Sequence, residues 1–208
     1  MPDSSQCRLQ LTSQIALASL LPLLLAGEAS AAVAFEVLGR RRRGCGDAAA
    51  MSTALAAIAA EERVHEGWLL EMRDALPQIP HDPALHVAAA QFFCSLASRN
   101  AGVHFARIAA LDSAVCIILG ALRRAQPHGY AGTLSRIATD ESRHVALSLR
   151  YARALTHREE RINAAAATRE SLATLLLMRG AAFEQLGIDT DRLRARISRP
   201  PRFLSASR

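Results

Sequence analysis

Two short segments of the sequence carry the same arrangement of acidic residues and histidine. Residues 61–65 read EERVH and residues 140–144 read DESRH. Each segment places a glutamate three positions before a histidine, and on a helix two such side chains lie on one face, one turn apart. Carboxylate and imidazole groups bind metals. The ligands offered are Glu62, His65, Glu141 and His144. Two such helices facing each other predict a site for two metal ions.

A bundle that holds two metal ions takes one further carboxylate from each of its other two helices. In an antiparallel helical hairpin, residues equally far from the turn face each other. Glu28 is about as far before the first predicted turn as Glu62 is after it, and Asp112 and Glu141 are related in the same way. Glu28 and Asp112 lie in apolar stretches, where an unpaired carboxylate is costly. We therefore predict both as ligands; the alternative is that each hydrogen-bonds locally.

An acidic residue directly precedes each of the two ligand glutamates. Metal-bound histidines usually donate their second ring N–H to a carboxylate. We expect Glu61 to orient His144, and Asp140 to orient His65, across the pair of helices. The arginines expected to neutralise these acids are Arg63 and Arg143. The alternative is that both acids are solvent-exposed on their helices.

The composition favours an all-α protein that could position these residues. Half of the residues are hydrophobic (50%), only 4% are aromatic, and Ala and Leu dominate. After an irregular start with a short helix within residues 3–20, we predict helices at about 22–43, 48–76, 84–98, 101–125, 130–155, 158–186 and 189–197. The expected breaks are the glycines at 44–46, the prolines at 77–83, the turn at 126–129 and Gly187. The 208 residues suit one domain, with a bundle core at about 22–155 and a helical extension at about 158–208.

Charge and cysteine content restrict the remaining function classes. The net charge is +6 and every basic residue is arginine. Arginine runs at 40–43 and 192–202 are typical of solvated helix ends, and the alternative is a docking patch for an anionic partner. The four cysteines show no C-x-x-C spacing, which argues against zinc and disulfides and favours reduced thiols in the cytoplasm. The apolar run that begins at 15–26 continues to Leu38 and is interrupted by Pro22 and Glu28, so we expect neither a cleaved signal nor a membrane span.

The predicted ligand set resembles that of the ferritin-like dinuclear carboxylate superfamily. DESRH at 140–144 is similar to the D-E-x-R-H signature of acyl-carrier-protein desaturases and bacterial multicomponent monooxygenases. EERVH at 61–65 looks like the matching first motif, and AGE at 26–28 resembles demethoxyubiquinone hydroxylases. The resemblance covers about residues 22–155 and departs from the family at Asp112, where Glu is usual. It implies a ferritin-like four-helix bundle with additional C-terminal helices.

The expected function is that of a non-haem di-iron oxidase or oxygenase. Four carboxylates and two imidazoles suit two iron ions, or manganese or a mixed pair, and they balance four positive charges. Two ferrous ions would reduce O₂ and so hydroxylate, desaturate or N-oxidise a small organic or carrier-bound substrate, with electrons from an external donor. The candidate pocket residues are His104, Trp68 and Tyr151, each with a packing role as the alternative.

Three other functions are weighed against this expectation. They are a ferroxidase or iron-storage protein of the same fold, a membrane-associated quinone hydroxylase, and a metal-free helical interaction module. An iron-storage protein has acid-rich internal surfaces, whereas this chain is basic. Nucleic acid is not an expected partner, and association with a membrane or a second copy of the chain is left open.

Overall fold

The computed structural model describes residues 4–41, 47–125 and 129–199, and the side chains of 10–41, 48–125 and 129–199. Within these residues the chain forms eight helices and no strand, which confirms the prediction of an all-α protein. The helices are α1 (Ser4–Arg41), α2 (Asp47–Ala75), α3 (Pro83–Ser95), α4 (Ala101–Ala125), α5 (Ala131–Leu155), α6 (Arg158–Leu177), α7 (Gly180–Gln185) and α8 (Thr190–Ser198). The predicted breaks at 44–46 and 126–128 lie outside the described residues.

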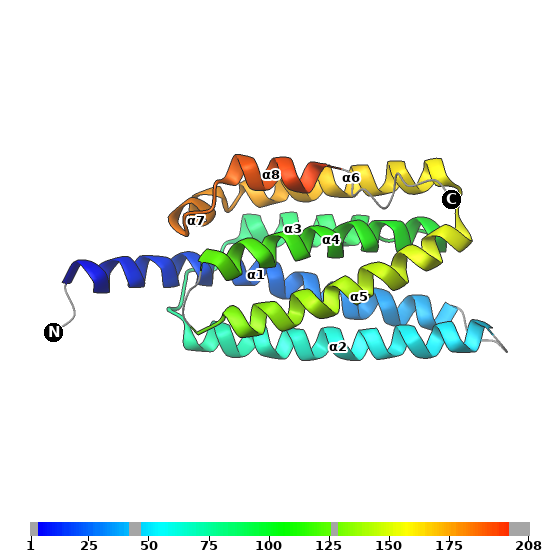
Figure 1. Ribbon diagram of the computed structural model, residues 1–208, viewed down its shortest axis with the longest axis horizontal. Coiled ribbons are helices and arrows are strands. Elements are labelled where there is room, and N and C mark those ends of the chain that lie inside the picture. The colour runs from blue at the N-terminus through cyan, green and yellow to red at the C-terminus, as the bar shows by residue number, and fades with distance from the viewer. Residues whose placement is uncertain (1–3, 42–46, 126–128, 200–208) are drawn as a thin grey trace.

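The four long helices pack as two hairpins (Figure 1). Helix α1 lies along α2, helix α4 lies along α5, and α2 also contacts α5, so that the two motif-bearing helices meet. Helices α6 and α8 cover the outer side of α4, while α3 and α7 pack against α1. The result is a bundle-like packing with apolar side chains from most helices in its interior.

The close contact between α4 and α5 depends on a glycine. A Cβ atom added to Gly102 would lie 2.6 Å from the Cβ of Thr156 and 2.7 Å from the carbonyl carbon of Leu155. Real Cβ atoms do not approach so closely, so only glycine lets the first turn of α4 touch the end of α5. This contact fixes the second hairpin at the end opposite its turn.

Helix α1 is longer than predicted, because it continues through Pro22. Proline inside a helix removes one backbone hydrogen bond and costs about 3 kcal/mol. Here Pro22 is exposed, while the residues on both sides of it, from Ala16 to Leu24, contribute seven buried side chains to the main core. Burial of this apolar face outweighs the cost of the proline, and the expected irregular start is helical from Ser4.

The predicted helix at 158–186 is divided in two. Helix α6 ends at Leu177, and Arg179 lies in the break with a conformation outside the helical range. The Arg179 guanidinium donates to the backbone oxygen of Ser19 (3.1 Å) and pairs with Asp82 (2.8 Å). These contacts with α1 and with the residue before α3 hold the break in place. Helix α7 ends at Gln185, and Gly187, the residue predicted to close this part of the chain, follows it with a φ of +72°.

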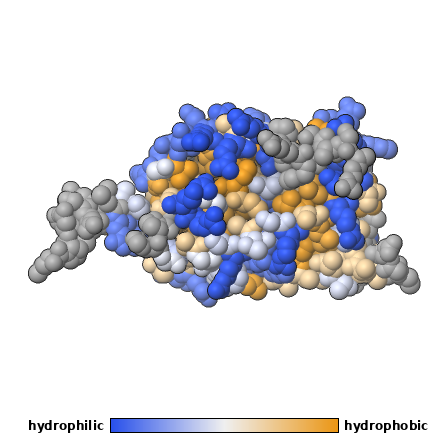
Figure 2. All heavy atoms as spheres, in the orientation of Figure 1, coloured by the Kyte–Doolittle hydropathy of each residue, from blue (hydrophilic) through white to orange (hydrophobic). Residues whose placement is uncertain are grey.

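Two helices are long and apolar enough to cross a membrane by length and composition: residues 10–41 of α1, and α4. In the folded chain 50% of the most apolar window of the first and 67% of the second are buried inside the protein. Packing within the bundle therefore accounts for much of their apolar character. On the face in Figure 2, hydrophobic side chains appear between bands of hydrophilic ones rather than as one continuous apolar surface.

Candidate metal centre

The structure brings the predicted ligands together in the interior of the bundle. Each long helix contributes at least one, and none is more than 5% exposed. The contributing residues are Glu28 of α1, Glu62 and His65 of α2, Asp112 of α4, and Glu141 and His144 of α5. Six ionisable side chains gathered in an apolar interior are costly unless they bind one another or a ligand.

Four of these residues form a compact group. Ligand atoms of Glu28, Glu62, His65 and Glu141 all lie within 4.8 Å of one another. The Nδ1 atom of His65 is 3.3 Å from Oε2 of Glu28, 3.6 Å from Oε2 of Glu62 and 3.6 Å from Oε1 of Glu141. One imidazole nitrogen and three carboxylates therefore converge on a volume that suits a metal ion.

His144 adjoins this group on the other side of Glu62. Its Nδ1 atom lies 2.9 Å from Oε1 of Glu62 and 3.8 Å from Oε2 of Glu141. The rings of His65 and His144 are 5.9 Å apart and are tilted by 31°. Glu62 and Glu141 thus lie between two inward-facing imidazoles, the position that carboxylates shared by two ions would take.

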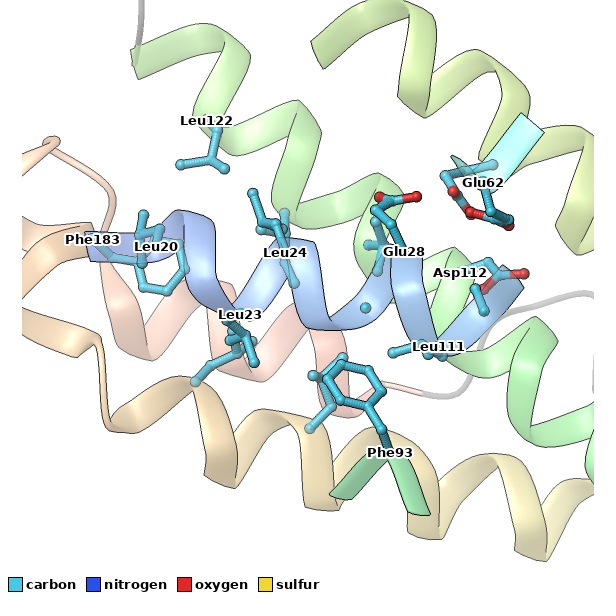
Figure 3. Close-up of a pocket in the computed structure, with 17 residues that line it drawn as sticks. Leu20, Leu23, Leu24, Glu28, Glu62, Phe93, Leu111, Asp112, Leu122 and Phe183 are labelled. Atoms are coloured by element: carbon cyan, nitrogen blue, oxygen red, sulfur yellow. The ribbon is translucent and has the colours of Figure 1, made fainter. Parts of the chain in front are cut away.

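Asp112 lies at the edge of the cluster. It is buried and lines the same cavity as Glu28, Glu62 and Glu141, but it is not part of the compact group of four. Figure 3 shows the carboxylates of Glu28, Glu62 and Asp112 at one end of this cavity. The aspartate is one methylene shorter than a glutamate, which fits its peripheral position.

The outward nitrogens of both histidines are held by acids from the opposite motif. Nε2 of His65 lies 3.1 Å from Oδ2 of Asp140, and Nε2 of His144 lies 2.8 Å from Oε2 of Glu61. Arg143 donates to Asp140, and its Nη2 atom is 3.5 Å from Oε1 of Glu61. These contacts link α2 to α5 and fix both rings with Nδ1 toward the cluster.

Arg63, the other arginine expected near these acids, takes a different partner. Its guanidinium pairs with Glu36 of α1 and donates to the backbone oxygen of Ala59. Glu36 also pairs with Arg40 at 3.3 Å, so it belongs to a surface network of charges. The expectation that Arg63 neutralises Glu61 or Asp140 is corrected: Arg143 alone contacts both acids among the described residues.

Burial and mutual proximity shift the ionisation of the cluster. Burial raises the pKa values of Glu28 and Asp112 well above their usual values, and the carboxylate of Glu141 adds to both shifts. Burial acts against charge at Glu62 too, but the imidazoles of His144 and His65 lower its pKa to about 2.

The pKa values of the two histidines are also shifted, by large amounts and for the same reason. Burial opposes their protonation, yet Glu141 and the other carboxylates raise the pKa of His65 to about 12 and that of His144 to about 11. Without metal, protons therefore balance the carboxylate charge, and metal ions would displace them.

Several buried polar atoms of the cluster lack a hydrogen bond within the described part of the chain. They are Oε1 and Oε2 of Glu62, Oδ2 of Asp112 and Nδ1 of His144. Oε1 of Glu62 and Nδ1 of His144 are in contact at 2.9 Å as an ion pair, without hydrogen-bond geometry. Buried polar atoms are almost always satisfied, so unsatisfied atoms that converge on one point need an explanation. Divalent metal ions would supply it, and oxygen and imidazole ligands suit iron or manganese. The donor set therefore fits the predicted metals.

The three candidate pocket residues lie in different places. Trp68 is partly buried against the main core, with its ring 5.7 Å from that of His65. Tyr151 packs against Phe105 at 5.2 Å in a second cluster. Neither lines the cavity beside the ligands, whereas His104 lines a surface hollow that reaches Asp112. Burial and the charges of Arg41 and Arg107 lower the pKa of His104 to about 4.

Sequence reasoning missed the residues that shape the cavity. Apart from the four acids, its wall consists of apolar side chains and one glycine, from α1, α3, α4, α6 and α7. Phe93 and Phe183 are the aromatic members. Sequence patterns give no signal for these residues, because leucines and phenylalanines that face a cavity have the same spacing as those that fill a core.

Replacing Asp140 with asparagine is expected to weaken metal binding by about ten- to a hundredfold, the usual cost of losing an acid behind a metal-bound histidine. Asparagine keeps the shape but not the charge that holds His65 by its Nε2 atom. Competition with a chelator would measure the affinity. Asp74→Asn, at an exposed position late in α2, is the control, and an unchanged affinity in Asp140→Asn would contradict the role of this contact.

Comparisons of the chain with family models, curated proteins and solved structures found no match. The residues of the cluster and of the cavity beside it are therefore the evidence for the function.

Proposed function

We propose that this protein is a non-haem di-iron oxidase or oxygenase with a ferritin-like bundle. The observation that carries the proposal is the buried cluster itself: four carboxylates and two imidazoles, with unsatisfied polar atoms directed inward. Glu28, Glu62, His65 and Glu141 would hold one ion, and His144 and Asp112 would complete the ligands of a second. Two ferrous ions bound there would supply electrons for the reduction of O₂ beside an organic substrate.

The protein side chains would position the metal ligands and keep water away from the reaction. Asp140 and Glu61 hold the two imidazoles with Nδ1 inward, so the ligands are arranged before metal binds. The apolar wall of the adjoining cavity keeps water away from the cluster, which limits side reactions. No dinucleotide-binding pattern is visible in the sequence, so we propose that electrons come from an external donor.

The adjoining cavity favours an oxygenase over an iron-storage protein of the same type. A storage protein must pass many hydrated ions through its interior, and such a path needs polar side chains. The cavity next to this cluster is lined by leucine and other apolar residues beyond its four acids. It therefore suits an organic molecule better than a stream of metal ions.

Oxygen consumption tests the proposal directly. The protein would be loaded with ferrous iron without air, freed of unbound iron, and mixed with oxygenated buffer in an oxygen electrode. We expect rapid uptake of O₂ that depends on the bound iron, with no further accumulation of iron in the protein. Uptake no faster than that of the same iron in buffer would contradict the oxygenase, and retention of many more than two iron atoms per chain would favour storage.

A further inference from the structure

A surface hollow of about 560 Å³ lies where α8 packs against the end of α4. Figure 1 shows the end of α4, α7 and the start of α8 at one end of the bundle. Three arginines line the hollow: Arg124 from the last turn of α4, and Arg192 and Arg196 from α8. The hollow shares no lining residue with the cavity beside the metal cluster. Arg124 lies about 18 Å beyond Asp112 along α4, at 1.5 Å per residue.

The three arginines are not neutralised by acids of the protein. Among the residues whose side chains are described, none forms an ion pair or a side-chain hydrogen bond with Arg124, Arg192 or Arg196. The segments 126–128 and 200–208, which lie close to these arginines in the sequence but outside the described residues, contain neither Asp nor Glu. All three residues are exposed, so their guanidiniums can contact a ligand from solution.

The acids on this side of the protein are engaged by backbone groups. Asp189 lines the hollow, and its Oδ1 atom accepts from the backbone N–H of Arg192 at 2.7 Å, which caps α8. Glu184 of α7 accepts from the backbone N–H of Thr190 at 2.7 Å. The three guanidiniums and the one carboxylate on the lining leave a net charge of +2.

The placement of two of the arginines is unfavourable for α8 itself. Arg192 lies in the first turn of this helix, where the positive end of the helix dipole disfavours a cation. Arg192 and Arg196 are four residues apart, so two like charges lie on one face and repel each other. A bound anion would remove both penalties. The alternative, that these arginines are only solvated, leaves both penalties in place.

The walls of the hollow are held by contacts that do not involve these arginines. The Arg169 guanidinium, which is only 2% exposed, donates to the backbone oxygens of Ile197 (2.6 Å) and Arg199 (2.8 Å) and so fixes the end of α8. The floor consists of buried or partly buried apolar residues: Ala121, Ala125, Leu186, Ile188 and Leu193. A site that is formed before binding loses less entropy when a ligand enters it.

We propose that this hollow binds a small phosphate monoester, with its phosphate group held by Arg124, Arg192 and Arg196. Planar guanidiniums donate paired hydrogen bonds to phosphate oxygens. A phosphate monoester carries a charge of about −1.5 to −2 at pH 7, which matches the net charge of +2 on the lining. The apolar floor contacts the organic part of the ligand, and the volume lies in the usual range of small-molecule sites, about 300–1,000 Å³.

Titration of the purified full-length protein with phenyl phosphate and with benzenesulfonate, measured by calorimetry, tests this assignment. The two probes have the same ring, but near pH 7 benzenesulfonate carries one negative charge and phenyl phosphate carries nearly two. We expect phenyl phosphate to bind at least about tenfold more tightly. Inorganic phosphate should bind more weakly than phenyl phosphate, because it leaves the apolar floor uncovered.

Variants of the arginines on α8 separate a defined site from a general effect of charge. Arg192→Gln and Arg196→Gln should each weaken the binding of phenyl phosphate about tenfold or more, the usual loss for a hydrogen bond between charged groups. Arg194→Gln is the matched control, because Arg194 is exposed on the same helix between these two residues and does not line the hollow. It removes the same charge and should change the affinity less than about twofold. Circular dichroism verifies that all three variants fold.

The proposal is overturned if phenyl phosphate binds no more tightly than benzenesulfonate, or if Arg194→Gln weakens binding as much as Arg192→Gln does. Vesicles that contain phosphatidic acid and a single-stranded oligonucleotide are the alternative probes. Tighter binding of either one, lost in Arg192→Gln and Arg196→Gln, would overturn the proposal in favour of a membrane or nucleic-acid surface. The hollow contains none of the metal ligands, so failure of this proposal leaves the proposed oxygenase intact, and the reverse also holds.

Discussion

Replacing Glu62 with alanine is expected to lower the iron content from about two ions per chain to less than one. Glu62 lies between the two imidazoles, 2.9 Å from Nδ1 of His144 and 3.6 Å from Nδ1 of His65. Neither oxygen forms a hydrogen bond in the described part of the chain beyond these contacts with the imidazoles, and metal ions would replace the contacts. Losing one partner of a buried charge costs about 3–5 kcal/mol, which is at least about a hundredfold in a binding constant.

Iron per chain would be measured by elemental analysis after anaerobic loading and removal of unbound iron. Glu71→Ala is the control, because Glu71 is an exposed acid on the same helix and does not belong to the cluster. Circular dichroism would show that both variants remain helical. Two ions per chain in Glu62→Ala would mean that Glu62 is not a shared ligand.

The metal-free protein is expected to lose stability as the pH rises above 6.5. The folded chain raises the pKa of His65 to about 12 and that of His144 to about 11, against about 6.5 in an unfolded chain. Their contribution is therefore complete below pH 6.5 and declines as the pH rises toward the folded values. Each proton that only the folded state holds changes the free energy of unfolding by about 1.4 kcal/mol per pH unit. One imidazole thus accounts for about 2 kcal/mol between pH 6.5 and 8.5, because half of the unfolded chains still hold the proton at pH 6.5.

Urea unfolding at several pH values, with a chelator present, would measure this trend. Replacing both His65 and His144 with glutamine should reduce the slope, whereas His157→Gln, at an exposed position before α6, should not. Added manganese should also reduce the slope of stability against pH, because metal ions take the place of the protons. A metal-free protein whose stability is unchanged between pH 6.5 and 8.5 would contradict the proton balance described for the cluster.

The repeated motifs carried most of the information on the site. The i, i+3 spacing puts Glu62 and His65 on one face, and the acid before each ligand glutamate faces the neighbouring helix. The contacts Glu61–His144 and Asp140–His65 follow from this geometry, and the structure contains both. Glu28 and Glu62 are about equally far from the first predicted turn, and this match was enough to predict Glu28 as a ligand. In the structure Glu28 belongs to the compact group.

Tertiary packing decided the features that the sequence did not predict. By local sequence rules Pro22 predicts the start of a helix. Helix α1 nevertheless continues through Pro22, because the apolar residues around it are buried in the core. The pairing of Arg63 with Glu36 of α1 depends on side-chain placement rather than on spacing along the sequence. The residues of the cavity wall could not be predicted either. Phe93 and Phe183 come from short helices, and the positions of these helices are set by contacts such as Arg179–Asp82.

The number of metal ions per chain tests the central claim most directly. The purified protein would be titrated with ferrous iron without air and dialysed to equilibrium, and the titration would be repeated with manganese. The six buried ligands predict saturation at about two ions per chain, with release of protons to the buffer as the imidazoles become ligands. Saturation below about one ion per chain with both metals would contradict a dinuclear centre in this cluster.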